Sequence, residues 1–359
     1  MGEQHIERRA RLAARLGDRG LDALLVTRLI NVRYLTGLDS SNAALLVRAE
    51  GPAVLATDSR YAGMAAQVAP ELEVVVERGT AAALAALAAD AGLERLGFEA
   101  HDLTVERHAE LTAQDGGVAF APAGHLVEEE RLVKDEQEIA LLAEACAITD
   151  RAFAAVLPLI EPGVTERAVA VALERFMVDF GAQGLAFESI VAAGPNGAVP
   201  HHHPSERPIG AGELVTLDFG ARYGGYHADM TRTVAVGEPA AWQREVYDLV
   251  LRAQLAGIAA AVPGADTVAV DAAARDVIAA AGHGEHFGHG LGHGVGLEIH
   301  EAPLMGYDET GKLMDRVPIT AEPGVYLAGR GGVRIEDTLV VRDGGAEILT
   351  QTTKDLLVL

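Results

Sequence analysis

The sequence predicts an α/β (or α+β) protein built from a small N-terminal α/β domain and a larger C-terminal domain whose two halves repeat one plan. Short apolar runs alternate with helical patterns over the first 120 or so residues, which is typical of α/β units. A polar, acidic segment at 121–139 follows, and beyond it similar motifs recur about a hundred residues apart. The length of 359 residues also fits two domains. We therefore expect domains at 1–128 and 129–359.

Within the N-terminal domain, helical patterns at 59–69 and 80–92 are expected between strands. The predicted strands are short apolar runs, at 21–27, 42–48, 52–57, 72–77 and 95–99. At the domain boundary, residues 128–145 are predicted to begin one long helix.

Composition excludes several classes of function. The chain has 29 basic and 52 acidic residues, a net charge of −23, whereas binding to nucleic acid or to an anionic membrane requires clustered Lys and Arg. The single cysteine, Cys146, excludes an intrachain disulfide and a site of several thiolates. The charged N-terminus lacks the apolar segment of a signal peptide, and no uncharged apolar stretch is long enough to span a membrane. We expect a cytoplasmic protein.

The C-terminal domain contains an internal repeat. Residues 161–176 and 262–278 share Pro-Gly, a Thr or Asp that can cap a helix, and then an Ala- and Val-rich helix. Further along, residues 214–236 and 321–341 share a strand, a turn containing Gly-Gly and a second strand. The repeat predicts two related halves, each presenting a hairpin.

Each hairpin carries two acids, and by order Asp218 corresponds to Glu322 and Asp229 to Glu336. Acidic residues are depleted in strands and are rarely buried unless they are paired or bind metal. Hairpins that face one another would bring the four carboxylates together, and four carboxylates cannot share a dry site without cations. The pattern therefore predicts two divalent ions, with one or more imidazoles completing the site.

Imidazoles are concentrated in HFGHGLGHGVGLEIHE, residues 286–301, where glycine occupies alternate positions over 288–296. Glycine in a strand permits close approach of another backbone, and we expect these glycines to make room for a peptide substrate. Residues 295–299 are expected to continue as regular β structure. In a second group of histidines, His202 and His203 are expected in a solvated loop.

Together these motifs resemble one protein family. They are NVRYLTGLDSSNAALLV (31–47), LDFGARYGGYHADMTRT (217–233), GHGLGHGVGLEIHEAP (288–303), AEPGVYL (321–327) and GVRIEDT (332–338). The set is similar to the metal-dependent Xaa-Pro peptidases of peptidase family M24, which include aminopeptidase P and prolidase and have the pita-bread fold. The resemblance covers about 130–359 closely, and the first motif resembles the creatinase/prolidase-type N-terminal domain.

The resemblance implies two metal ions held by Asp218, Asp229, His293, Glu322 and Glu336, with Asp229 and Glu336 bridging. One imidazole among oxygen donors suits Mn²⁺, which we expect first, or Co²⁺, Zn²⁺ or Fe²⁺. A hydroxide bridging the ions is the implied nucleophile, and Glu322 is the implied proton shuttle.

Five more residues acquire expected roles from the resemblance. His289 and His300 would hydrogen-bond the substrate or stabilise the tetrahedral intermediate, and His201 would lie on the leaving-group side, all three as catalytic residues. Tyr326 and Arg334 would bind substrate or support the metal ligands. For Arg334 a purely structural ion pair is the alternative.

The predicted function is hydrolysis of the N-terminal Xaa-Pro bond by an Xaa-Pro aminopeptidase, with prolidase, an Xaa-Pro dipeptidase, as the alternative. The expected partners are small proline-containing peptides and, as the family implies, copies of the same chain in a homodimer or homotetramer. Methionine aminopeptidase would not need the N-terminal domain, and creatinase lacks this metal ligand set. A non-catalytic peptide-binding protein on the same fold would be expected to have lost ligands, and none is lost here.

Overall fold

The structure, a computed structural model, describes residues 2–113, 116–308 and 310–359. Contacts within the chain divide it into two compact units, Met1–Arg131 and Leu132–Leu359.

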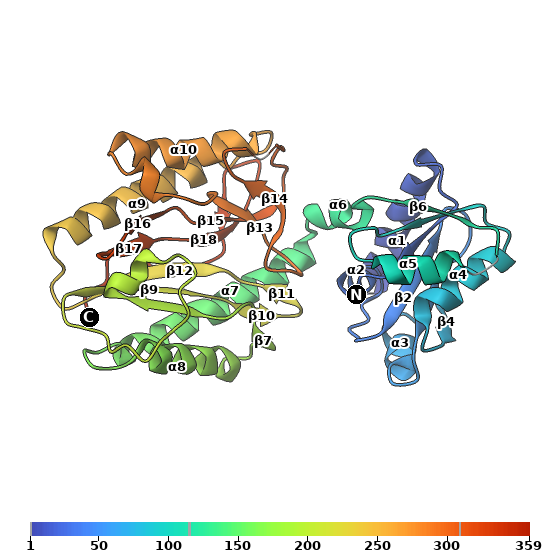
Figure 1. Cartoon of the computed structure of the whole chain (residues 1–359), viewed down its shortest axis with the longest axis horizontal. Coiled ribbons are helices and arrows are strands. Elements are labelled where there is room, and N and C mark those ends of the chain that lie inside the picture. Colours follow the sequence, from blue (N-terminus) through green and yellow to red (C-terminus); the bar gives the residue numbers. More distant parts are fainter. Residues whose placement is uncertain (1, 114–115, 309) are drawn as a thin grey trace. The chain divides into compact units, whose positions relative to one another are not determined.

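The N-terminal unit is built on a six-stranded mixed sheet (Figure 1). Its strands are β1 (Ala23–Val26), β2 (Ala43–Arg48), β3 (Val54–Thr57), β4 (Glu73–Val76), β5 (Arg95–Phe98) and β6 (Ala119–Pro122), in the order β4-β3-β2-β1-β5-β6. Its helices are α1 (Gly2–Asp18), α2 (Leu29–Thr36), α3 (Ala62–Val68), α4 (Thr80–Asp90), α5 (Val105–Thr112) and α6 (Leu126–Leu132). β5 lies parallel to both β1 and β6, so the carboxyl ends of these three strands meet at one edge.

The strands and helices predicted for this unit are confirmed, but the long helix predicted from residue 128 is wrong. The chain forms α6, which ends at Leu132, and then a separate helix, α7 (Glu136–Val156). Asp135 separates them, because its side chain accepts hydrogen bonds from the backbone N–H groups of Gln137 and Glu138 while Glu138 accepts one from the backbone of Asp135. This reciprocal capping box starts a new helix.

In the C-terminal unit, layers of strands lie between two pairs of helices (Figure 1). The pairs are α7 with α8 (Glu166–Asp179) and α9 (Ala241–Ala260) with α10 (Thr267–Ala280). The strands are β7 (Gly184–Leu185), β8 (Ile190–Ala193), β9 (Glu213–Phe219), β10 (Ala221–Tyr223), β11 (Tyr226–His227), β12 (Met230–Val236), β13 (Gly292–Gly294), β14 (Glu301–Met305), β15 (Pro318–Ala321), β16 (Gly324–Leu327), β17 (Gly331–Arg334), β18 (Asp337–Val340) and β19 (Glu347–Ile348). Among the described residues, no helix has the length and apolar character needed to cross a membrane.

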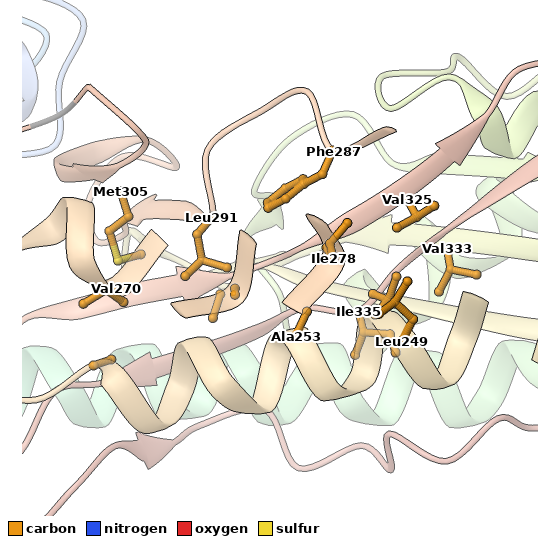
Figure 2. Close-up of a cluster of buried hydrophobic side chains, with 14 of the residues drawn as sticks. Leu249, Ala253, Val270, Ile278, Phe287, Leu291, Met305, Val325, Val333 and Ile335 are labelled. Atoms are coloured by element: carbon orange, nitrogen blue, oxygen red, sulfur yellow. The ribbon is translucent and has the colours of Figure 1, made fainter. Parts of the chain in front are cut away.

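The predicted repeat is visible in the order of elements and in the packing. In the first half α7 and α8 precede the sheet β12-β9-β8, and in the second half α9 and α10 precede the sheet β14-β13-β15-β18-β19. Each half has its own buried apolar cluster. Figure 2 shows the second cluster, in which Leu249 and Ala253 of α9 and Ile278 of α10 pack with Val333 and Ile335 from the β17 region. Full burial of a side chain of the Val, Leu or Ile class contributes about 1.5–3 kcal/mol, so these clusters fix the hairpins against their helices.

One expectation for residues 286–301 is wrong, because residues 295–299 are not a strand: β13 ends at Gly294, where the pairing with β14 shifts register. The alternating glycines make room for the protein's own backbone, and room for a substrate beside them stays a prediction. A Cβ on Gly290, Gly292 or Gly294 would lie 2.5, 2.3 or 2.1 Å from a backbone oxygen of a neighbouring segment.

Candidate metal centre

The four acids of the repeat lie at matched ends of two hairpins. β9 and β12 pair antiparallel, with Asp218 inside β9 and Asp229 one residue before β12. β15 and β18 pair in the same way, with Glu322 one residue after β15 and Glu336 one residue before β18.

Hydrogen bonds hold these two ends together. The N–H of Glu336 donates to the carbonyl of Thr231 over 3.1 Å. The N–H of Asp229 donates to the hydroxyl of Thr338 over 3.2 Å, and that hydroxyl donates back to the carbonyl of Asp229 over 2.7 Å. The acids are therefore placed by hydrogen bonds that join the backbones next to them, directly or through the hydroxyl of Thr338, across more than a hundred positions.

Asp229, His293 and Glu336 form one buried group whose ligand atoms all lie within 4.8 Å of one another. The Nε2 atom of His293 lies 3.5 Å from Oδ2 of Asp229 and 3.6 Å from Oε1 of Glu322. The Nδ1 atom of His293 lies 2.9 Å from the carbonyl oxygen of Gly294, so Nδ1 carries the proton and donates it. This leaves the lone pair of Nε2 facing the carboxylates, as a metal ligand requires.

The electrostatics of the group call for cations. Burial, followed by the charges of neighbouring carboxylates, raises the pKa of Asp229 and of Glu336 well above the ordinary range. Burial likewise raises the pKa of Glu322 to about 7, although the charges of His293 and Arg334 act in the opposite direction. Carboxylates held this close repel one another, and bound divalent ions remove that repulsion.

Unsatisfied atoms support the same conclusion. Oδ1 of Asp218 and Oε1 of Glu336 are buried without a hydrogen-bond partner. A buried oxygen of this kind costs about 1–3 kcal/mol unless something coordinates it. Oxygen donors with one imidazole fit a hard or borderline divalent ion such as Mn²⁺, Co²⁺, Fe²⁺ or Zn²⁺.

Arg334 organises one side of the centre. Its Nη2 donates to Oδ2 of Asp218 over 2.6 Å, its Nη1 donates to the hydroxyl of Tyr326 over 2.9 Å, and its Nε donates to the hydroxyl of Thr231 over 3.1 Å. Thr231 in turn donates to Oε2 of Glu336 over 2.7 Å. Arg334 therefore forms the ion pair expected as one alternative, and its partner Asp218 is itself a candidate metal ligand.

His289 is held in its neutral form. Burial lowers its pKa to about 4. Its Nδ1 donates to the carbonyl of Gly290 over 2.8 Å, and its Nε2 accepts from the hydroxyl of Tyr326 over 2.8 Å. Burial also raises the pKa of Tyr326 to about 12, which keeps this hydroxyl protonated. Both nitrogens of His289 have protein partners, so a substrate contact requires one of these bonds to be exchanged.

The centre opens into a cavity of about 570 Å³. All the residues singled out in the sequence line it except Tyr326, which lies behind His289: His201, Asp218, Asp229, His289, His293, His300, Glu322, Arg334 and Glu336. The ring of His300 lies 4.5 Å from that of His293, centroid to centroid, and burial lowers its pKa. Thus the structure brings candidate metal ligands, imidazoles and free volume to one place.

Comparison with known proteins identifies this arrangement. The model of metallopeptidase family M24 matches residues 140–343, which contain every residue of the centre. The chain belongs to metallopeptidase family M24. The model of the creatinase/prolidase N-terminal domain matches residues 8–133. The fold is therefore the pita-bread fold of these peptidases, preceded by their N-terminal domain.

Relatives within the family resemble the whole chain. A Pyrococcus horikoshii protein named Xaa-Pro dipeptidase is 37% identical over 339 residues, which are 94% of this chain and 95% of that protein. The structure of an Xaa-Pro dipeptidase from Bacillus anthracis matches with a TM-score of 0.95 and 40% identity, covering 99% of this chain and all of the other. The structure of an X-Pro aminopeptidase from Thermotoga maritima matches with a TM-score of 0.89 and 35% identity, covering 95% and 98%.

The family motifs did not reveal how the segment that carries His201 is held. His202, expected in a solvated loop, has a side chain only 17% accessible, and its Nε2 lies 2.9 Å from Oε2 of Glu166. Glu166 is fully buried and also accepts hydrogen bonds from the backbone of Ala193 and from the side chain and backbone of Ser205. His203 is exposed, as expected.

Glu166 and Thr231 were not among the predicted site residues, because the local signals for both are weak. An acid after a helix N-cap is ordinary, since it also complements the helix dipole. A threonine in a strand is ordinary as well. A signal was present for Thr231 in one respect, because it follows Asp229 at the spacing that returns a side chain to the same face of a strand.

Proposed function

We propose that this peptidase is a prolidase, which hydrolyses the bond before proline in Xaa-Pro dipeptides with divalent metal held by Asp218, Asp229, His293, Glu322 and Glu336. The observation that carries the proposal is the buried group of ligand atoms on the wall of the cavity. The relatives named Xaa-Pro dipeptidase favour a dipeptide substrate over the aminopeptidase activity that the motifs first indicated.

Divalent ions, with Mn²⁺ expected first and two per chain, would supply Lewis acidity that polarises the scissile carbonyl and acidifies a water molecule. Glu322 is the proposed proton carrier. Its side chain is 19% accessible, against 7% for Asp229 and 9% for His293, so it faces the cavity most openly of these three. Its carboxylate would take a proton from the attacking water and pass it to the proline nitrogen that leaves.

The histidines around the cavity are the proposed substrate contacts. His300 is mostly neutral near pH 7 because burial lowers its pKa, so it can donate one hydrogen bond without carrying charge. His201 lines the same cavity and would hold the carbonyl oxygen or the carboxylate of the dipeptide. His289 would do so only by exchanging its hydrogen bond to Gly290 or to Tyr326 for one to the substrate. An Xaa-Pro bond has no amide N–H, so a site that offers no acceptor for that N–H tolerates proline.

A second candidate is an Xaa-Pro aminopeptidase, which would accept longer peptides. The structure named X-Pro aminopeptidase from Thermotoga maritima supports this candidate, since it matches nearly the whole chain. Peptide length separates the two activities.

The test offers purified protein Ala-Pro, Ala-Pro-Phe and Ala-Ala-Phe, each with added Mn²⁺ and again with a chelator. We expect rapid release of proline from Ala-Pro with Mn²⁺, little cleavage of the tripeptides, and no cleavage with chelator. Equally rapid cleavage of Ala-Pro-Phe would assign the aminopeptidase activity. Failure to cleave either proline peptide would contradict both candidates.

The ligand assignment is tested by Asp229→Ala, which should abolish Mn²⁺ binding at this centre, measured by elemental analysis after loading with Mn²⁺ alone. The control is Asp248→Ala, which removes an exposed acid from α9 and should leave the metal content unchanged. Two metal ions per chain in Asp229→Ala would show that the assignment is wrong.

A further inference from the structure

The N-terminal unit contains a second group of potential metal ligands, made of two histidines and one glutamate. One ligand atom each of His101, His125 and Glu128 lies within 4.8 Å of the others. We propose that these three residues bind one zinc ion, in addition to the metal held by the M24 centre.

Strand pairing explains why the two histidines meet. β5 and β6 are parallel neighbours, with Phe98 opposite Pro122 at their carboxyl ends. His101 and His125 each lie three residues beyond that pair, in the two segments that leave the same edge of the sheet. Their rings lie 4.3 Å apart, centroid to centroid. Glu128 follows His125 by three residues at the start of α6, so it points to the same side as His125.

The carboxylate of Glu128 is oriented as a metal ligand is oriented. Its Oε1 accepts hydrogen bonds from Nη1 of Arg28 over 2.9 Å and from Nδ2 of Asn31 over 2.8 Å. Nε2 of His101 lies 2.9 Å from the same oxygen, and zinc would replace the proton shared between them. Oε2 of Glu128 is buried, has no hydrogen-bond partner, and lies 3.9 Å from Nδ1 of His125. Donors that fix one oxygen and leave the other free are the usual support of a carboxylate ligand.

Charge and access favour an ion here. Burial acts to raise the pKa of Glu128, but its hydrogen bonds lower that pKa to about 2, so the carboxylate is ionised at neutral pH. The side chain of His125 is 64% accessible and that of His101 is 24% accessible, so an ion can enter from solvent and keep water in its remaining position.

The donor set selects the metal. Two imidazoles and one carboxylate with an open position form a ligand set that zinc uses. Tetrahedral ligands 2.0–2.1 Å from zinc lie about 3.4 Å apart, so small rotations of the two exposed rings close the group from 4.8 Å. Hard ions such as Mg²⁺ and Ca²⁺ prefer oxygen donors and would bind weakly.

Zinc stoichiometry tests the proposal on the full chain. Metal-free protein is dialysed against buffered micromolar Zn²⁺ and analysed for zinc. We expect His101→Ala and His125→Ala each to bind one zinc ion fewer per chain than the wild type, with affinity at this site lowered at least tenfold. The control is Glu129→Gln. Glu129 is next to Glu128 on α6, but its side chain pairs with Arg15, so this variant should bind as much zinc as the wild type. Equal zinc content in all variants, or the same loss in Glu129→Gln, would overturn the proposal.

A second measurement needs only the wild-type protein. Diethyl pyrocarbonate modifies accessible imidazoles, and mass spectrometry reports each site. Zn²⁺ should protect His101 and His125 from modification, while His108, which packs on Phe98 and Phe120, should react at an unchanged rate. Unchanged modification of His125 with saturating Zn²⁺ would overturn the proposal independently of any variant's folding.

Discussion

Thr231→Val isolates the contribution of one hydroxyl to the metal centre. The side chain of Thr231 is completely buried, and valine matches its shape. The hydroxyl donates to Oε2 of Glu336 over 2.7 Å and accepts from Nε of Arg334 over 3.1 Å. Its removal leaves Glu336 without the donor that orients it, while the backbone of β12 is unchanged.

The magnitude follows from these two bonds. A hydrogen bond to a charged group is worth about 1.5–3 kcal/mol, and the carboxylate and the guanidinium each lose one. Removing a group that orients a metal ligand commonly weakens metal binding 10–100-fold, which corresponds to about 1.4–2.7 kcal/mol. We therefore expect the Kd for Mn²⁺ to rise 10–100-fold in Thr231→Val, with lower activity at limiting metal and partial recovery at high Mn²⁺.

The assay is calorimetric titration of metal-free protein with Mn²⁺, alongside Ala-Pro hydrolysis at several Mn²⁺ concentrations. Thr233→Val is the matched control. Thr233 is equally buried on the same strand, but its hydroxyl bonds the backbone carbonyl and N–H of Arg334 instead of a metal ligand. Both variants should lose some stability, and only Thr231→Val should lose metal affinity. Wild-type affinity in Thr231→Val, or equal weakening in both variants, would refute the reasoning.

Two further predictions concern Glu322 and the segment that carries His201. In metal-free protein, Glu322 has its pKa raised from 4.5 to about 7, so the stability it contributes in the protonated form is lost as pH rises from about 4.5 to 7. The free energy of unfolding, measured with urea on metal-free protein, should be the same for Glu322→Gln and the wild type at pH 4.5. At pH 8 it should be higher for Glu322→Gln by up to about 3 kcal/mol. If the difference in the free energy of unfolding between the two proteins did not change with pH over this range, the raised pKa of Glu322 would be contradicted. His202→Ala removes one donor from buried Glu166 and should raise KM for Ala-Pro several-fold at unchanged metal content. The control is His286→Ala, at an exposed histidine that does not line the cavity, which should leave KM unchanged. Equal KM values in the two variants would show that His202 does not position this segment.

Much of the fold and the candidate ligand set could be predicted because their signals are local or repeated. The strands of the N-terminal unit could be located from the alternation of apolar runs and helical patterns, because the spacing of apolar residues within a short segment predicts whether it forms a strand or a helix. The acids of the two hairpins were found because the same unexpected residue type occurs twice in matched apolar strands. The break between α6 and α7 was missed although its signal is local, a capping box from Asp135 to Glu138.

The sequence by itself determined most of the elements, the duplication and the four acids of the candidate ligand set, because side-chain period and repetition are properties of short segments; His293 joined that set through the family resemblance. Only the tertiary structure decided which oxygen of each acid is left free, since the donors come from far along the chain: Arg334 reaches Asp218 across 116 positions, and Thr231 reaches Glu336 across 105. It also decided that the glycines of β13 receive the protein's own backbone, because close approach depends on which strand lies alongside. In the same way, burial of His202 depends on Glu166 and not on its exposed neighbour in sequence.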